Sequence, residues 1–163
     1  MESNQSSPKA PRLHPRRLQK TPVHLEGAAA LERLCFPAAP WSAQSLELLT
    51  NEGIGVGYLL TDPADGNTVV AYGGMLITVD EGQITNIAVH PDHRRRGYGA
   101  AILRALLRHA KDARLESVSL EVRPSNTAAV AMYRAAGFAE AGRRKSFYTK
   151  PTEDALVMIC KIK

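Results

Sequence analysis

Cysteine is scarce in this 163-residue chain: Cys35 and Cys160 are the only two, too few for a disulfide scaffold. Long apolar runs are absent as well, and no segment approaches the ~20 residues that a membrane-spanning helix needs. The N-terminal segment lacks the apolar stretch of a secretory signal. Aromatic residues make up 6% of the chain and apolar residues 44%, as in ordinary globular proteins. We therefore expect one soluble domain in the reducing cytoplasm.

Acidic residues are almost missing from the N-terminus, where Glu2 alone accompanies five basic residues. Residues 1–20 thus contribute +4 to the net charge of +5, which leaves +1 for residues 21–163. A domain that coats nucleic acid is therefore not expected, nor is sequence-specific nucleic-acid binding. The Ser, Pro, Arg and Lys content of residues 1–20 predicts a disordered basic tail before a domain at 21–163. Such a tail is more often solvated than bound to an anionic partner such as RNA.

Capping residues and apolar spacing define the elements of the first half. Thr21-Pro22 is a typical helix start, and Phe36-Pro37 ends the helix that it begins. Ser42 is placed to cap a second, short helix. Three strand-like runs follow, and turns rich in Asp and Gly separate them, so the strands are expected to pair antiparallel. These runs cover residues 55–61, 68–79 and 83–90.

The second half alternates between helical and strand periodicity. An amphipathic helix comes first, with apolar residues around Leu106 on one face and basic residues around Arg108 on the other. Residues 117–123 then alternate strictly between apolar and polar side chains, as in a strand. Gly137 is expected to end a second helix in the left-handed conformation. Together these patterns predict a mixed α/β sheet, completed by a helix at 126–136 and strands at 141–148 and 155–162.

The most informative stretch, residues 84–99, has the pattern of a strand, a basic turn, two glycines and the start of a helix. Gly97 and Gly99 let backbone N–H groups approach a ligand closely. The N-terminus of the helix adds about half a positive charge, and the arginines at 94–96 add more. The stretch therefore predicts an anion site suited to a pyrophosphate.

Three loop types compete for this stretch. A Rossmann dinucleotide loop needs a small residue where Ile102 stands, and a tighter turn than the one before Gly97. A P-loop needs the string G-x-x-x-x-G-K-[ST], which the sequence does not contain. The pyrophosphate loop of the GNAT acetyltransferases has the pattern [QR]-x-x-G-x-[GA], and residues 94–99 match it at every specified position. On this loop alone, a plain basic turn before a helix is the remaining alternative.

Further motifs extend the match along the chain. The strand before the loop ends Asn86-Ile-Ala-Val89, residues 120–126 are LEVRPSN, and residues 131–138 are AMYRAAGF. With these motifs the chain resembles the GNAT superfamily over roughly residues 20–160. Within it, the sequence most resembles the RimI-type branch of bacterial enzymes, which acetylate the N-terminal alanine of a small-subunit ribosomal protein.

This resemblance implies the α/β fold of the GNAT acyl-CoA N-acyltransferases. In that fold, antiparallel N-terminal strands join a βαβα half, and the two central strands splay apart. The resemblance also implies acetyl-CoA as the donor, bound between the splayed strands by strand backbone, by the pyrophosphate loop and by the next helix start. The implied cofactor-binding residues are Ile87, Ala88, Val89, Arg94, Arg95, Arg96, Gly97, Tyr98, Gly99, Ala100 and Asn126.

Glu121 and Tyr133 match the general base and the general acid of that branch. Glu121 lies on the polar side of its alternating strand, and Tyr133 lies two helical turns after Asn126. An α-amine with a pKa of about 7.7–8.0 must lose a proton before it attacks a thioester. A carboxylate can accept that proton, and a phenol can return one to the departing thiolate. On the residues alone, a solvated carboxylate and a core tyrosine are the competing interpretations.

The acceptor side is where the sequence departs from the family. The resemblance implies Trp41 and Tyr148 as substrate-binding residues, but the family's Phe-Pro-Trp-Ser appears as residues 36–42 with three residues inserted, and its tandem tyrosines as Phe147-Tyr148. The implied acceptor is a protein N-terminal α-amine, that of a ribosomal-protein alanine in particular. A lysine or small-molecule amine is the alternative acceptor, and a non-catalytic acyl-CoA-binding module is the alternative of another class.

His90 and His93 flank a Pro-Asp turn, a spacing that suggests a metal. No third ligand is evident near them, and both belong to the proposed phosphate loop. We therefore expect no metal.

Overall fold

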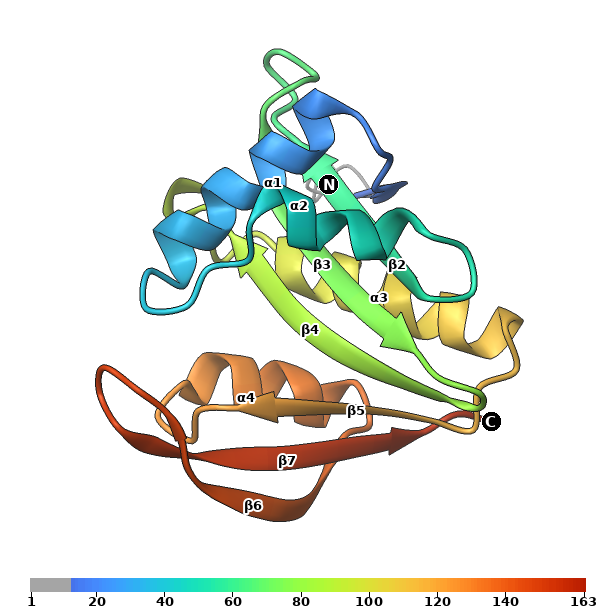
Figure 1. The fold of residues 1–163 in the computed structure, drawn as a ribbon, viewed down its shortest axis with the longest axis vertical. Helices are drawn as coiled ribbons and strands as arrows, with labels where there is room; N and C mark the ends of the chain where they lie inside the picture. Colours follow the sequence, from blue (N-terminus) through green and yellow to red (C-terminus); the bar gives the residue numbers. More distant parts are fainter. Residues whose placement is uncertain (1–12) are drawn as a thin grey trace, which may run out of the picture.

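One mixed sheet flanked by helices forms the fold of the computed structural model, which describes residues 13–163 (Figure 1). The helices are α1 (Pro22–Cys35), α2 (Ala43–Leu46), α3 (Tyr98–Asp112) and α4 (Thr127–Ala135), with short 3-10 turns η1 (Glu47–Thr50) and η2 (Pro91–His93). The strands are β1 (Arg16–Arg17), β2 (Gly55–Thr61), β3 (Val69–Ile77), β4 (Glu81–Val89), β5 (Ser117–Val122), β6 (Ala139–Tyr148) and β7 (Glu153–Lys161).

The strand order across the sheet is β1-β2-β3-β4-β5-β7-β6, so β7 inserts between β5 and β6. Every neighbouring pair is antiparallel except β4 and β5, which run parallel. The predicted antiparallel pairing of the early strands and the predicted mixed α/β sheet are both confirmed. Within residues 13–163, no helix has both the length and the apolar content needed to span a bilayer.

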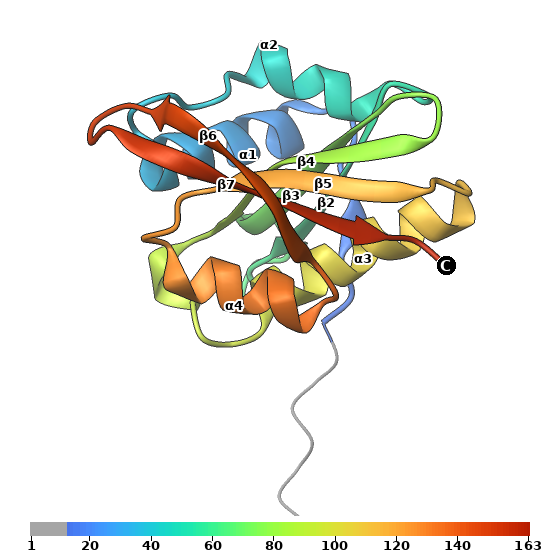
Figure 2. The same ribbon diagram turned by 90° about the horizontal axis from the view of Figure 1, so that it is seen from below.

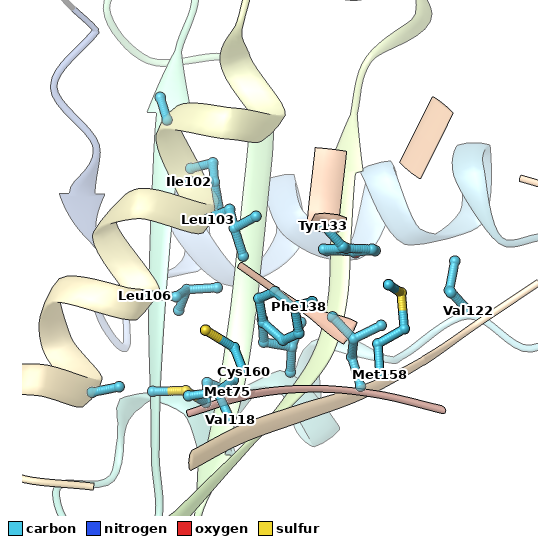
Figure 3. Packing of buried hydrophobic residues seen from close by; sticks show 14 of the residues in the cluster. Met75, Ile102, Leu103, Leu106, Val118, Val122, Tyr133, Phe138, Met158 and Cys160 are labelled. Carbon is cyan, nitrogen blue, oxygen red and sulfur yellow. The ribbon is translucent and has the colours of Figure 1, made fainter. Parts of the chain in front are cut away.

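The helices cover the sheet on both sides. Figure 2 shows α1 and α2 on one face and α3 and α4 on the other. The larger hydrophobic cluster lies under α3 and α4 and includes Ile102 and Leu106 of α3, Met75 of β3 and Val118 of β5 (Figure 3). A smaller cluster lies under α1 and α2 and includes Leu31, Leu46 and Tyr72. Each face of the sheet therefore has its own core.

The pairing of β4 with β5 is confined to one end, where residues 81–83 lie beside residues 117–119. Just beyond that end, β4 carries a bulge: between Ile84 and Ile87 it has one residue more than the facing segment of β3. A bulge bends its strand and increases the local twist. The rest of β4 therefore turns away from β5, and Figure 1 shows the two strands meeting at one end and diverging toward the other.

Local signals in the sequence place the helix ends correctly. Thr21, Ser42 and Asn126 each cap a helix, because the side-chain oxygen accepts the backbone N–H three positions later. Gly137 follows α4 with a φ of 105°, the left-handed conformation that was predicted for it. The strand at 55–61 is confirmed at both ends.

The predicted tail boundary at residue 20 is wrong. Arg16 and Arg17 pair with β2, the N–H of Leu18 donates to the carbonyl of Gly57 at 2.8 Å, and the Leu18 side chain is only 3% exposed. This segment is ordered because it pairs with β2, which lies about forty residues later in the chain. The composition of residues 1–20 alone did not indicate that pairing. Residues 1–12 of the predicted tail lie outside the described residues.

Replacement of Leu18 by Ala is expected to lower the free energy of unfolding by about 2–5 kcal/mol, because it removes a buried side chain. Denaturant unfolding measures the change. Leu34→Ala is the matched control, since Leu34 is 51% exposed and keeps about half of its surface in contact with water on folding. Equal small effects for the two variants would show that the segment before residue 20 does not belong to the folded domain.

Candidate active site

The divergence of β4 and β5 opens a cleft of about 540 Å³. Both strands and α4 line it, together with the connection between α1 and α2 and the connection between β6 and β7. Figure 2 places these two connections at the same end of the molecule. Because β4 and β5 hydrogen-bond to each other only at residues 81–83 and 117–119, the cleft passes between their backbones.

Glu121 lies in the cleft on the α1 side of the sheet. Its neighbours Leu120 and Val122 are buried against the α3 and α4 core, so strand alternation turns the Glu121 side chain the other way. The Gln83 amide donates to the carboxylate at 3.2 Å, and the Arg144 guanidinium lies 3.3 Å from it. The side chain is 15% exposed. The predicted alternation is confirmed, and it places a held, partly buried carboxylate in the cleft.

Tyr133 reaches the same cleft from the opposite face. It comes from α4, is buried, and packs edge-on against Phe138 with ring centroids 5.7 Å apart (Figure 3). Burial, assisted by nearby Tyr148, raises the pKa of Tyr133 to about 12. Its phenol therefore keeps its proton at neutral pH and acts as a hydrogen-bond donor.

Tyr148, at the end of β6, is the second phenol that lines the cleft. Burial and then the charge of Glu121 raise the pKa of Tyr148 to about 12, against the opposite effect of Arg123. The guanidinium carbon of Arg123 stacks 4.4 Å from the centre of the Tyr148 ring. One carboxylate and two protonated phenols thus share the cleft.

Arg123 is a site residue that the sequence prediction missed. Its guanidinium donates to the carbonyls of Thr149 and Pro151, each at 2.9 Å, and lies 3.8 Å from the Glu153 carboxylate. These contacts hold the connection between β6 and β7 against the end of β5. The available signal was its position, two residues after Glu121 on the same side of the strand.

The predicted pyrophosphate loop leads into the N-terminus of α3. Gly97 is the N-cap with a φ of 78°, and Arg95 also has a positive φ, of 63°. The first N–H groups of a helix lack partners within the helix and attract anions. Tyr98, Gly99 and Ala100 form the first turn of α3, while Arg95 and Arg96 are exposed beside it. This geometry fits the phosphate site that the sequence predicts.

Arg94 differs from the neighbouring arginines in its contacts. Its Nε donates to the carbonyl of Val89 at 3.1 Å, and its guanidinium lies 3.7 Å from the Cys35 Sγ. In this structure Arg94 therefore braces the loop against the end of β4.

The cleft continues toward this anion site. Met132 of α4 lines the cleft, and a Cβ on Gly99 would lie 3.2 Å from its Sδ, so the helix start and the cleft adjoin. Asn126, the cap of α4, also lines the cleft. A phosphate-bearing acyl thioester such as acetyl-CoA needs an anion site joined to a narrow, largely apolar channel. The described residues fit that group.

Not every predicted site residue lines the cleft. Ile87 does, whereas Ala88 is buried in the α1 core and Val89 lies beside Gly99. Trp41 packs against the α1 core and is not part of the cleft wall. The role predicted for the Trp41 side chain thus has no counterpart in the cleft, although the preceding residues of its loop do line it.

His90 and His93 have other contacts. The ring of His90 accepts the N–H of Asp92 at 3.1 Å, and His93 lies 3.8 Å from the Asp62 carboxylate. The part of the chain that the structure describes contains no group of three side chains suited to hold a metal ion.

Comparison with known proteins identifies the class. The Acetyltransferase (GNAT) family matches residues 25–138, which is more than half of the chain. The chain therefore belongs to the GNAT acetyltransferase family, as the sequence motifs predicted, and is an acetyl-CoA-dependent N-acetyltransferase.

Within the family, the chain is similar to ribosomal-protein alanine N-acetyltransferases. The [ribosomal protein bS18]-alanine N-acetyltransferase of Escherichia coli K12 is 35% identical over 127 residues, which cover 77% of this chain and 83% of that protein. The crystal structure of the Escherichia coli ribosomal-protein-S18-alanine N-acetyltransferase superimposes with a TM-score of 0.78 at 31% identity, over 92% of this chain and 95% of that one. The predicted GNAT fold is confirmed.

A more distant structure shows the fold alone. An aminoglycoside 6'-N-acetyltransferase complexed with coenzyme A superimposes with a TM-score of 0.77 at 13% identity, over 93% of this chain and 98% of that one. Enzymes named for different acceptors, an aminoglycoside and a ribosomal protein, share this fold, so the fold alone does not identify the acceptor.

Replacement of Gly97 by Ala is expected to raise the KM for acetyl-CoA by about 5- to 30-fold, because an L-residue in the left-handed conformation costs about 1–2 kcal/mol. No atom lies within 4 Å of the new Cβ, so the effect comes from the backbone of the loop. Initial-rate kinetics measure it. Gly53→Ala is the control, since Gly53 has a φ of 81° and equally open surroundings. An equal rise in both variants would contradict the assignment of the loop.

Proposed function

We propose that this chain transfers the acetyl group of acetyl-CoA to a protein N-terminal α-amine, that of an N-terminal alanine in a small-subunit ribosomal protein. One observation carries the chemistry: Glu121 and Tyr133 come from opposite faces of the sheet and line one cleft between β4 and β5. The acceptor is supported by the name of the Escherichia coli relative, with which the chain shares 35% identity over most of both lengths.

Glu121 is proposed as the general base. At neutral pH an α-amine is mostly protonated and carries no free lone pair for attack. The Glu121 carboxylate, placed in the cleft by strand alternation, takes the ammonium proton directly or through one water. Gln83 and Arg144 hold the carboxylate in place without closing it to solvent. Such a positioned base typically contributes about 10²- to 10⁴-fold in rate.

Tyr133 is proposed as the donor to the leaving group. When bound, acetyl-CoA supplies the activated acyl carbon: the new C–N bond forms there and the C–S bond breaks. Because the pKa of Tyr133 is about 12, its proton stays on oxygen until negative charge develops on the sulfur. The phenol then donates to that sulfur and regains a proton from solvent. By this stage the ammonium proton has passed from Glu121 to water, so the carboxylate takes the second proton, which the nitrogen releases as the amide forms. No chain nucleophile is needed, so transfer is direct.

The walls of the cleft on the Glu121 side are proposed to receive the acceptor. Phe36 to Ala39 form one wall, and Tyr148 to Pro151 form the other. Arg123 fixes the second wall by its two bonds to backbone carbonyls. An acceptor amine that enters between these walls meets Glu121 before it meets the thioester end of the channel.

The proposed function is tested by acetyl-CoA turnover with three acceptors, followed by mass spectrometry of the products. The acceptors are a peptide that begins with alanine, the same peptide with a blocked N-terminus and an internal lysine, and a polyamine. Acetylation of the first peptide alone is expected. Transfer to the lysine or to the polyamine instead would contradict the proposed acceptor. Tight acetyl-CoA binding without turnover on any acceptor would favour a non-catalytic acyl-CoA-binding module.

Glu121→Gln and Tyr133→Phe are each expected to lower kcat by more than about tenfold while the Kd for acetyl-CoA stays unchanged, because each removes one proton-handling group. Initial-rate kinetics measure kcat, and calorimetric titration measures the Kd for acetyl-CoA. Glu47→Gln and Tyr58→Phe are the matched controls, since both residues lie outside the cleft. Full activity in both cleft variants would rule out the proposed roles.

A further inference from the structure

Glu32 of α1 is the one charged residue that is fully buried in the part of the chain that the structure describes. It does not line the cleft and takes no part in the chemistry proposed above. A buried carboxylate is costly unless hydrogen-bond donors surround it, and apolar residues of similar size often serve stability equally well. Its presence in the α1 core therefore calls for an explanation other than packing.

Three donors from three different segments meet the Glu32 carboxylate. The Tyr72 hydroxyl of β3 and the Asn86 amide of β4, the latter at 2.8 Å, both donate to Oε1. The backbone N–H of Trp41 donates to Oε2 at 3.2 Å. Burial, and then the charge of Glu32, raise the pKa of Tyr72 well above its ordinary value, so this phenol remains a donor.

These contacts lead to the cleft in two ways. Asn86 itself lines the cleft. Residues 36–39 of the loop at 36–41 form one wall of it. Glu32 holds both ends of that loop: its backbone carbonyl accepts the N–H of Phe36 at 2.7 Å, and its carboxylate accepts the N–H of Trp41. The loop is thus closed onto a single residue of α1.

We propose that Glu32 is a positioning residue for the acceptor. Glu32 acts indirectly, because it anchors the loop at 36–41 at both ends and so fixes residues 36–39 as a wall of the cleft. This inference rests on the proposed function in one respect, namely that the acceptor is a peptide that contacts this wall. The loop carries the insertion that distinguishes the chain from the family pattern, Phe-Pro-Ala-Ala-Pro-Trp. A longer loop has more conformations to lose, so a side-chain anchor at its far end restores a defined wall.

Glu32→Gln changes the bonding with little change in size. The amide has one acceptor oxygen and one NH₂ group, whereas three donors point at the two oxygens of Glu32. With the oxygen toward Tyr72 and Asn86, the NH₂ group faces the N–H of Trp41. The bond to the loop is then lost, while the bonds to the sheet remain.

The test compares the wild-type enzyme with E32Q on an alanine-starting peptide. The KM for the peptide is expected to rise about 3- to 10-fold, as for the loss of one hydrogen bond, while the KM for acetyl-CoA and kcat stay within about twofold. Trp41 is the only tryptophan of the chain, so its fluorescence reports on the loop directly. Acrylamide quenching of Trp41 is expected to increase in E32Q.

Tyr72→Phe is the matched control, because it removes a donor from the same carboxylate without touching the loop. It is expected to lower stability but to leave the peptide KM and the quenching of Trp41 unchanged. An unchanged peptide KM in E32Q, or equal changes of both KM values, would overturn the proposal. So would the same quenching increase in both variants.

The outcome stays decisive if E32Q does not fold. In the wild-type enzyme, peptide that packs on the wall at 36–39 is expected to restrain the loop that ends at Trp41, so saturating peptide lowers the quenching of Trp41. No change on peptide binding would overturn the proposal. The failure of the proposed function is distinct from these results. It would appear as a wild-type enzyme that acetylates no peptide, while the quenching of E32Q against Y72F would still test the loop contact.

Discussion

The separation of β4 from β5 is the constraint on which the rest of the structure depends. In a closed sheet, the side chains of Glu121 and Tyr133 would lie on two sides of a continuous layer of backbone. The strands can part because each keeps its other neighbour: β4 stays paired with β3, and β5 pairs with β7 along its whole length. The divergence therefore costs only the hydrogen bonds that β4 and β5 would otherwise make with each other beyond residues 81–83 and 117–119. The bulge in β4 concentrates the bend at one place.

Held polar groups around this opening keep its walls in place. Arg123 connects the end of β5 to the turn between β6 and β7, and Glu32 connects α1 to the loop that faces that turn. One anchor is cationic and binds carbonyl groups, and the other is anionic and binds N–H groups, so each satisfies backbone atoms that a loop cannot pair internally. Loops at a binding site gain a defined shape in this way without becoming part of the sheet.

The sequence predicts those features that depend on neighbours in the chain. Helix starts at Thr21, Ser42 and Asn126, the strand alternation around Glu121, and the glycine loop at 94–99 are all local patterns, and the structure contains each of them. The features it misses depend on distant partners. Leu18 is ordered by β2, Arg123 acts on carbonyls 26 and 28 residues away, and Glu32 on side chains 40 and 54 residues away. No periodicity or motif encodes such pairings, because they exist only once the sheet has formed.

The placement of Glu121 and Tyr133 on opposite faces has a consequence for how the acceptor and the donor reach the cleft. The sheet acts as a partition with one opening, with the glycine loop and the start of α4 on one side and the two walls at 36–39 and 148–151 on the other. In the proposed reaction, the acceptor approaches from the second side and does not cross the path of the donor. With the proposed acceptor side, the donor channel sets no limit on the size of the molecule behind the amine, and exchange of spent donor does not require the acceptor to leave.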